Sequence, residues 1–139
     1  MKSKSFHAPR PNIYERMYTK LEKLLGELDK LPDAGKSESK GYMDLHFDKL
    51  FVDPDGRTVI ALAHYFRMNG DSVPDPDMQI RIDHKLKTVE ALTYQDLTRY
   101  SEVYPKPGLI DAAARSHMND FLSLWLTNLI EQGHRIVPR

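Results

Sequence analysis

The chain has 139 residues, a length typical of one domain with its own hydrophobic core. Its 20 Lys and Arg residues balance 20 Asp and Glu residues, so it lacks the basic excess of strong nucleic-acid binders. It contains no cysteine, which excludes disulfides, thiolate metal sites and a cysteine nucleophile. No apolar run approaches a membrane span, and the basic N-terminus leads into no secretory signal. We therefore expect a soluble, cytoplasmic protein without a membrane partner.

The N-terminal part is predicted to contain an arm, a helix and a loop. Residues 1–11 are expected to form a flexible arm, and residues 12–139 a single domain. Apolar residues recur at helical spacing between Asn12, a candidate helix cap, and Pro32, which is expected to stop the helix. The polar stretch 32–40 has the composition of a loop.

Two strands are predicted next. Apolar and polar residues alternate over 43–48, which indicates a half-buried strand. Lys49 interrupts the alternation, where either a bulge or a twist is expected. The sequence Asp-Pro-Asp-Gly at 53–56 is strongly turn-forming. It leads into 58–66, whose apolar and β-branched residues predict the central strand of a sheet. The two segments are expected to pair as a hairpin.

A second hairpin is predicted after an irregular segment. Residues 68–77 are rich in Asp, Pro and Gly and are expected to form an acidic loop. Segments 78–83 and 88–95 are predicted strands, with a turn at 84–87. Residues 96–110 leave two alternatives open, a fifth strand or a loop that crosses the sheet.

The last predicted element is a helix. Asp111 is its candidate N-cap, Gly133 ends it, and Phe121 and Trp125 fall on its apolar stripe and are expected in the core. The order of elements predicts an α+β fold with a four-stranded antiparallel sheet, or a five-stranded one, made of two hairpins. The N- and C-terminal helices are expected to pack on one face of that sheet.

The acidic loop at 69–77 is the most unusual segment. Asp71, Asp75 and Asp77 could supply oxygen ligands to a hard cation. The spacing matches no calcium loop, however, and turn chemistry alone accounts for each residue. The sequence therefore predicts no bound metal and no cofactor.

Histidines form a second candidate cluster. Asp44, His46 and Asp48 share one predicted strand face, where His46 is either a base or metal ligand, or a solvated side chain. His64 follows on the neighbouring strand and would approach His46 only in a suitable register. His134, near the end of the last helix, is expected to have a capping or surface role.

Tyrosines form a third candidate cluster. Tyr94, Tyr100 and Tyr104, with Arg99, could stack on a planar ligand or pack under the sheet edge. The balanced charge argues against nucleic acid as that ligand. Tyr94 and its neighbour Asp96 are nevertheless candidate binding residues.

Several motifs of the C-terminal half occur together: Asp-Pro-Asp-Met at 75–78, Tyr-Gln-Asp at 94–96 and Asn-Asp-Phe-Leu at 119–122. In combination they resemble the proteobacterial family of unknown function typified by YqiB-like proteins, over residues 12–139. The resemblance implies a small cytoplasmic bacterial protein, and it brings no activity, cofactor or catalytic residue. The Tyr-Gln-Asp motif is one residue shorter than the Tyr-Gln-Gln-Asp form expected in that family.

Because no nucleophile–base spacing or metal motif is visible, the sequence favours a non-catalytic protein-binding or regulatory module. Asn119 would then organise the fold by bonding to backbone before the last helix. The paired helices or an exposed sheet edge would meet a protein partner or a second copy in a homodimer. The alternative is a small metal-dependent or hydrolase-like enzyme that uses the acidic loop, with a site drawn from Asp71, Asp75, Asp77, Tyr94, Asp96 and His64.

Overall fold

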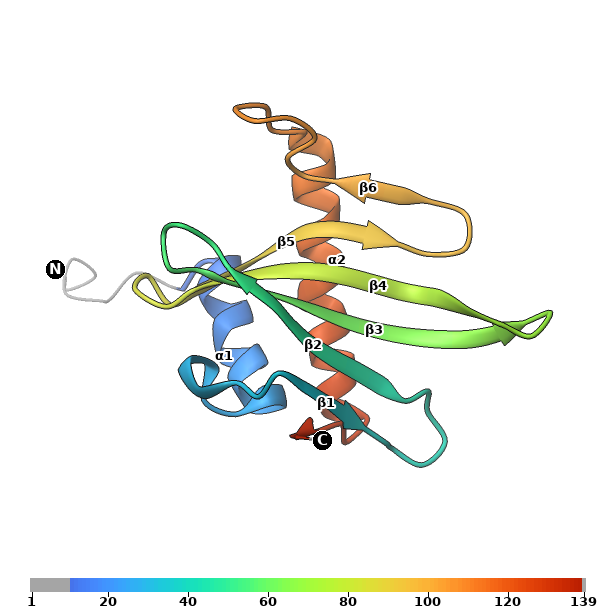
Figure 1. Ribbon diagram of the computed structural model, residues 1–139. Coiled ribbons are helices and arrows are strands. Elements are labelled where there is room, and N and C mark those ends of the chain that lie inside the picture. Colours follow the sequence, from blue (N-terminus) through green and yellow to red (C-terminus); the bar gives the residue numbers. More distant parts are fainter. Residues whose placement is uncertain (1–10, 139) are drawn as a thin grey trace, which may run out of the picture.

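The computed structural model describes residues 11–138. The arm predicted at 1–11 therefore lies outside the described residues except for Pro11, and the division into an arm and one domain stays a prediction. Figure 1 shows two helices on one side of a long, twisted sheet. Within residues 11–138, neither helix has the length and apolar character needed to cross a membrane.

The first helix, α1 (Ile13–Leu25), begins where the sequence predicts. The Asn12 side chain accepts a hydrogen bond from the Glu15 backbone N–H at 2.9 Å, and the Glu15 carboxylate accepts one from the Asn12 N–H at 3.0 Å. This reciprocal pair satisfies two backbone donors that the helix itself leaves free. The helix ends at Gly26, well before the proline expected to stop it, and a short 3₁₀ helix, η1 (Leu28–Lys30), follows.

Six antiparallel strands form the main sheet, in the order β6-β5-β4-β3-β2-β1. Each strand therefore pairs with its neighbours in sequence. A two-residue strand, β7 (Val137–Pro138), adds to the β1 edge. The bounds of the six are β1 (Ala34–Ser37), β2 (Leu45–Val52), β3 (Thr58–Met68), β4 (Asp71–Asp83), β5 (Thr88–Gln95) and β6 (Tyr100–Glu102).

The predicted sheet of four or five strands thus has fewer strands than the observed one. The stretch 32–40, predicted to be a loop, contains β1, which pairs with β2 over four residues. Its sequence, Ala-Gly-Lys-Ser, carries no strand pattern, and pairing with β2 holds it extended. Of the two alternatives for 96–110, the strand is confirmed, because β6 pairs with β5 there.

The predicted acidic loop is the largest correction. Residues 71–77 belong to β4 and pair with β3, so only Asn69 and Gly70 turn the chain, with φ angles of 53° and 84°. The register shifts where His64 of β3 faces Asp75 and Pro76 of β4. A bulge at this point accommodates a residue that lacks a backbone N–H.

Other local predictions are confirmed. The β2–β3 register shifts between Lys49 and Phe51, and the Asp53 carbonyl accepts from the Gly56 N–H at 3.0 Å in the turn between them. The second helix, α2 (Ala112–Glu131), is capped by Asp111, whose side chain accepts from the Ala114 N–H at 3.0 Å.

Both helices pack on the same face of the sheet, as predicted (Figure 1). The core takes alternate residues from the central strands, as expected for a sheet with one covered face. Figure 1 also shows α2 crossing the strands while the β3–β4 hairpin runs on beyond it. The fully buried large side chains are Phe47, Met17, Leu21, Leu24, Leu45, Ile60, Leu62, Met78, Ile80, Ile82, Leu122 and Leu126.

Candidate functional site

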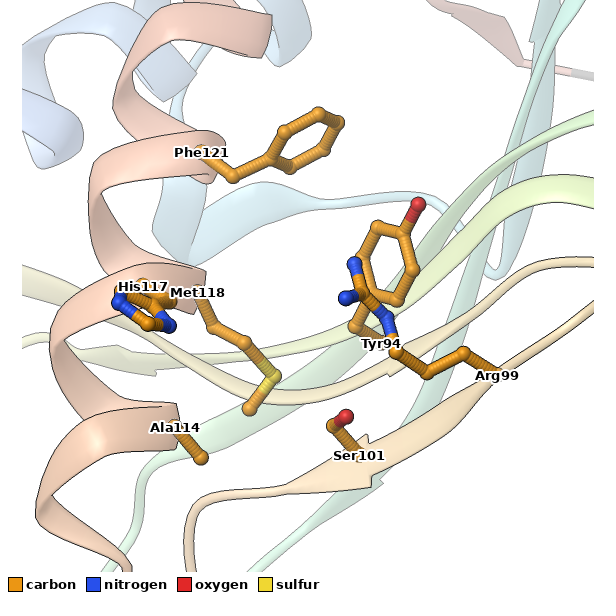
Figure 2. A pocket seen from close by; sticks show the side chains of 7 residues that line it. All are labelled: Tyr94, Arg99, Ser101, Ala114, His117, Met118 and Phe121. Atoms are coloured by element: carbon orange, nitrogen blue, oxygen red, sulfur yellow. The ribbon is translucent and has the colours of Figure 1, made fainter.

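Two adjoining hollows lie beside α2 on the helix side of the sheet. The smaller, of about 110 Å³, is lined by Tyr94, Arg99, Ser101, Ala114, His117, Met118 and Phe121 (Figure 2). The larger, of about 350 Å³, is lined by Tyr42, Met43, His64, Asp75, Pro76, Tyr94, Phe121, Trp125, Asn128 and Gln132. Because Tyr94 and Phe121 line both, the hollows meet at these two rings. We call the two together the α2 groove.

The smaller hollow lies between α2 and the β5–β6 end of the sheet. Figure 2 shows Met118 extending from α2 toward the strands, and Arg99 lying against the ring of Tyr94. The Arg99 guanidinium carbon is 5.0 Å from the Tyr94 ring centroid, within cation–π range. A cation is therefore already held against one aromatic wall of the groove.

Tyr94 and Asp96 act as a pair rather than as two separate ligands. The Tyr94 hydroxyl donates to Asp96 Oδ2 at 2.7 Å, and the Thr98 N–H and hydroxyl donate to the other carboxylate oxygen. These hydrogen bonds lower the pKa of Asp96, led by the one from Tyr94. Burial raises the pKa of Tyr94, and the hydrogen bond to the Asp96 carboxylate raises it further. Asp96 thus fixes the ring of Tyr94 instead of facing the groove as a free carboxylate.

His64 lies on the covered side of the larger hollow. Its Nδ1 is 2.9 Å from the backbone carbonyl oxygen of Asp44, and the side chain is only 6% exposed. A carbonyl only accepts, so Nδ1 carries a proton, and in the neutral ring Nε2 is then an acceptor. The ring also meets Trp125 edge-on, with centroids 5.5 Å apart.

His134 is buried beside His64, so the surface alternative of its predicted capping or surface role is wrong. The two ring centroids are 5.9 Å apart, and His134 Nδ1 lies 2.8 Å from Ser37 Oγ. Ser37 Oγ also accepts from the Arg135 N–H at 2.9 Å. The pair therefore ties β1 to the segment after α2. Burial, together with His64, lowers the pKa of His134.

Aromatic rings form one wall of the larger hollow. Trp125 and Phe121 stand one turn apart on α2 with centroids 6.0 Å apart, and Tyr94 meets Phe121 edge-on at 5.4 Å. Trp125 is almost buried, as predicted, whereas Phe121 is exposed and lines both hollows. The expectation that Phe121 belongs to the core is therefore wrong. Tyr42, from the segment before β2, is more than half exposed and completes the aromatic lining.

The polar lining of the larger hollow is mostly neutral. Asn128 and Gln132 come from α2 and its end, and Asp75 comes from β4, next to Pro76. The peptide bond between Asp75 and Pro76 is cis. Among the ten lining residues, Asp75 is the only one with a formal charge when His64 is neutral.

The predicted binding residues separate in space. Asp75 and Tyr94 line the larger hollow, with Asp96 behind Tyr94. Asp71 lies exposed near the hairpin tip, and Asp77 accepts from the Tyr65 hydroxyl at 3.5 Å. Burial raises the pKa of Asp77. In the described part of the chain, no three His, Asp or Glu side chains are grouped so that they could hold a metal ion.

The predicted histidine cluster also separates. The β2–β3 register places His46 opposite Ala63, and His46 meets Tyr65 edge-on at 5.4 Å. His64 instead meets Trp125 of α2, because successive residues of a strand point to opposite faces. Asp44 pairs with Lys36 at 3.5 Å.

The three tyrosines form no common platform. The Tyr104 hydroxyl donates to Glu90 at 2.6 Å, Tyr94 lines the groove, and Tyr100 is exposed on the edge strand β6. Sequence reasoning missed the role of Asn128 and Gln132. Only the position of α2 against β3 and β4 brings these residues beside His64, and nothing local in the sequence marks it.

The fold and the groove define an α+β protein with an aromatic-lined concave surface beside its second helix. The chain belongs to the family described as "Domain of unknown function (DUF6908)", whose model matches residues 13–135. No curated protein and no solved structure matches it. A family of unknown function is what the sequence predicts. None of these comparisons links the chain to YqiB-like proteins, and that resemblance stays a prediction.

Proposed function

We propose that this protein is a non-catalytic binding module that receives a segment of a protein partner in the α2 groove. The observation that carries the proposal is an apolar rim around the groove. Tyr42, Met43, Phe121 and Leu124 are 53%, 41%, 37% and 61% exposed. Leu124 lies one turn after Phe121 and one turn before Asn128 on α2, and both of these residues line the larger hollow, so we expect the Leu124 side chain beside it. Exposed apolar side chains gathered around a concave site are typical of recognition surfaces.

The larger hollow offers groups for binding rather than the parts of a reaction. Among the described residues, its lining contains no serine, threonine or lysine. Ser37, which does contact a histidine, is 3% exposed and already engaged by the Arg135 N–H. The enzyme alternative relies on an acidic loop, and that segment is strand β4 with Asp75 alone lining the hollow. These features favour a module over an enzyme.

The partner, the compartment and the source belong to the same proposal. We place the module in the cytoplasm of a bacterium, without membrane or nucleic-acid partners, and we favour a separate protein over a second copy. Light scattering at two concentrations distinguishes these occupants. A second copy would be identified as the occupant if the molecular mass of the wild type rises with protein concentration while that of Leu124→Asp stays at the monomer value.

Selection from a displayed library of random 12-residue peptides tests the proposal and does not require the partner to be identified. Peptides enriched on the wild-type protein should share a consensus and should lose binding to Leu124→Asp and to Phe121→Ala. Leu86→Asp is the matched control, because Leu86 is 69% exposed and lies in the β4–β5 turn. The proposal fails if no consensus emerges, or if the peptides bind Leu124→Asp as well as they bind the wild type.

A further inference from the structure

We propose that the larger hollow of the α2 groove recognises a basic side chain, Lys or Arg, of the bound segment. This inference rests on the proposed function and specifies what the segment carries. With a volume of about 350 Å³, the hollow is at the small end of the range of ligand sites, roughly 300–1,000 Å³. It therefore suits one long side chain of an extended segment.

The charge of the lining is the first argument. Asp75 supplies a carboxylate, and among the described residues neither Lys nor Arg lines the larger hollow. The basic residues of the groove, Arg99 and His117, line the smaller hollow instead. Asp75 is exposed, and an apolar side chain in the larger hollow would leave its carboxylate without a partner. A cation would pair with it.

The aromatic lining is the second argument. Tyr94 already holds Arg99, but Tyr42, Phe121 and Trp125 line the same space, and cations are attracted to the faces of such rings. This protein makes the same kind of pair three times within its own fold, with guanidinium carbons 5.0–5.6 Å from ring centroids. The three pairs are Arg81 with Tyr104, Arg99 with Tyr94, and Arg115 with Tyr14.

The hydrogen-bonding groups are the third argument. His64 donates through Nδ1 to the Asp44 carbonyl, which leaves Nε2 of the neutral ring as an acceptor. The side-chain oxygens of Asn128 and Gln132 are further acceptors among the lining residues. A lysine ammonium has three N–H donors and an arginine guanidinium five, so either finds partners in this lining.

A pair of isosteric probes tests the charge requirement. N-acetyl-arginine amide carries a charged guanidinium where N-acetyl-citrulline amide carries a neutral urea of the same shape. Trp125, the chain's single tryptophan, can report the binding of either probe. We expect the arginine probe to change Trp125 fluorescence and to bind about tenfold more tightly than the citrulline probe. Asp75→Asn should weaken arginine binding by about threefold to tenfold and leave citrulline binding unchanged.

Asp71→Asn is the control variant, since Asp71 lies exposed on the same strand near the hairpin tip. It should leave both affinities unchanged, and the melting temperatures of both variants should match the wild type. Equal affinity for the two probes, or no binding of the arginine probe, overturns the inference. A library consensus that needs Leu124 but contains no Lys or Arg also overturns it while the proposed function stands. If no consensus emerges, both fail.

Discussion

The two faces of the sheet differ in what holds them together. The helix-covered face is apolar and closed, with Phe47, Leu62 and Ile80 fully buried. The opposite face carries ion pairs and hydrogen bonds, such as that of Arg81 with Glu90 at 3.1 Å. Because burial of apolar surface dominates folding free energy, the covered face sets the stability. Pairs on the open face contribute little by comparison.

The groove lies where the covered face ends. The β3–β4 hairpin runs on beyond α2 (Figure 1), and His64 and Pro76 lie on these two strands. Side chains that would otherwise enter the core line a hollow there instead. The proposed binding surface is therefore the edge of the core that α2 leaves uncovered. Substitutions can test whether the core, this edge and the open face differ as described.

The largest expected effect is in the core. Leu122→Ala should lower the free energy of unfolding by about 2–5 kcal/mol, because Leu122 is fully buried between α2 and the sheet. Leu124→Ala, two residues along the same helix, should change it by no more than about 0.5 kcal/mol, since Leu124 borders the groove in solvent. Urea unfolding measures both, and similar losses would contradict the assignment of Leu124 to an exposed rim.

Asn119 should give the next largest effect. Its side chain accepts from the Ala91 N–H of β5 and donates to the Arg115 carbonyl, both at 2.8 Å. The sequence predicts that Asn119 hydrogen-bonds to the backbone of the loop before the helix. Its side chain instead hydrogen-bonds to the backbone of strand β5 and of α2 itself. Asn119→Ala leaves a buried N–H without a partner and should cost about 1–3 kcal/mol in urea unfolding.

Asn128→Ala is the matched control, because Asn128 is exposed on the same helix. Its loss should stay below about 0.5 kcal/mol. Equal losses for the two asparagines would mean that Asn119 does not tie α2 to the covered face.

The buried His134 predicts a pH dependence. Its pKa lies below the ordinary value of 6.5, because burial and the His64 ring disfavour the charged form. The unfolded chain then binds the proton more readily, so stability is complete above about pH 6.5 and falls as the pH drops below it. The slope should not exceed about 1.4 kcal/mol per pH unit, since one proton is involved.

Unfolding curves between pH 7.5 and 5 would measure this slope, and His134→Gln should remove it. His117→Gln should retain it, because His117 is exposed on α2. A slope that persists in His134→Gln would assign the effect to another group.

The smallest effect is expected on the open face. Glu90→Gln weakens the ion pair with Arg81 and should cost no more than about 1 kcal/mol. It should also lower the pKa of Tyr104, which is raised by burial and then by the hydrogen bond to Glu90. Carbon NMR of the tyrosine ring follows that titration. A loss of stability as large as that of Leu122→Ala would contradict the contrast between the faces.

The parts of the fold that follow from sequence are those fixed by local chemistry. The caps Asn12 and Asp111, the bulge beside Lys49, and the bounds of β5 depend on neighbouring residues. Strand β1 does not, because Ala34–Ser37 is held extended by pairing with β2 and β7, which are distant in sequence or follow a loop. The first half of β4 is likewise extended by its long partner β3, against its loop-like composition.

The same distinction applies to the groove. Asp75 and Tyr94 are candidate binding residues in the sequence because of the composition of the segments around them, and both line the larger hollow. His64, Trp125 and Asn128 come together only when α2 crosses the sheet, a contact between segments far apart in sequence. Their common site therefore required the tertiary structure.

The central claim is that binding takes place in the α2 groove and not on the open face. Trp125 is the chain's single tryptophan and lines the larger hollow, so its emission reports directly on that site. A peptide selected on the wild-type protein should change Trp125 emission with the same midpoint as its binding curve, and Leu124→Asp should abolish both. Binding that saturates without any change in Trp125 emission would contradict the claim.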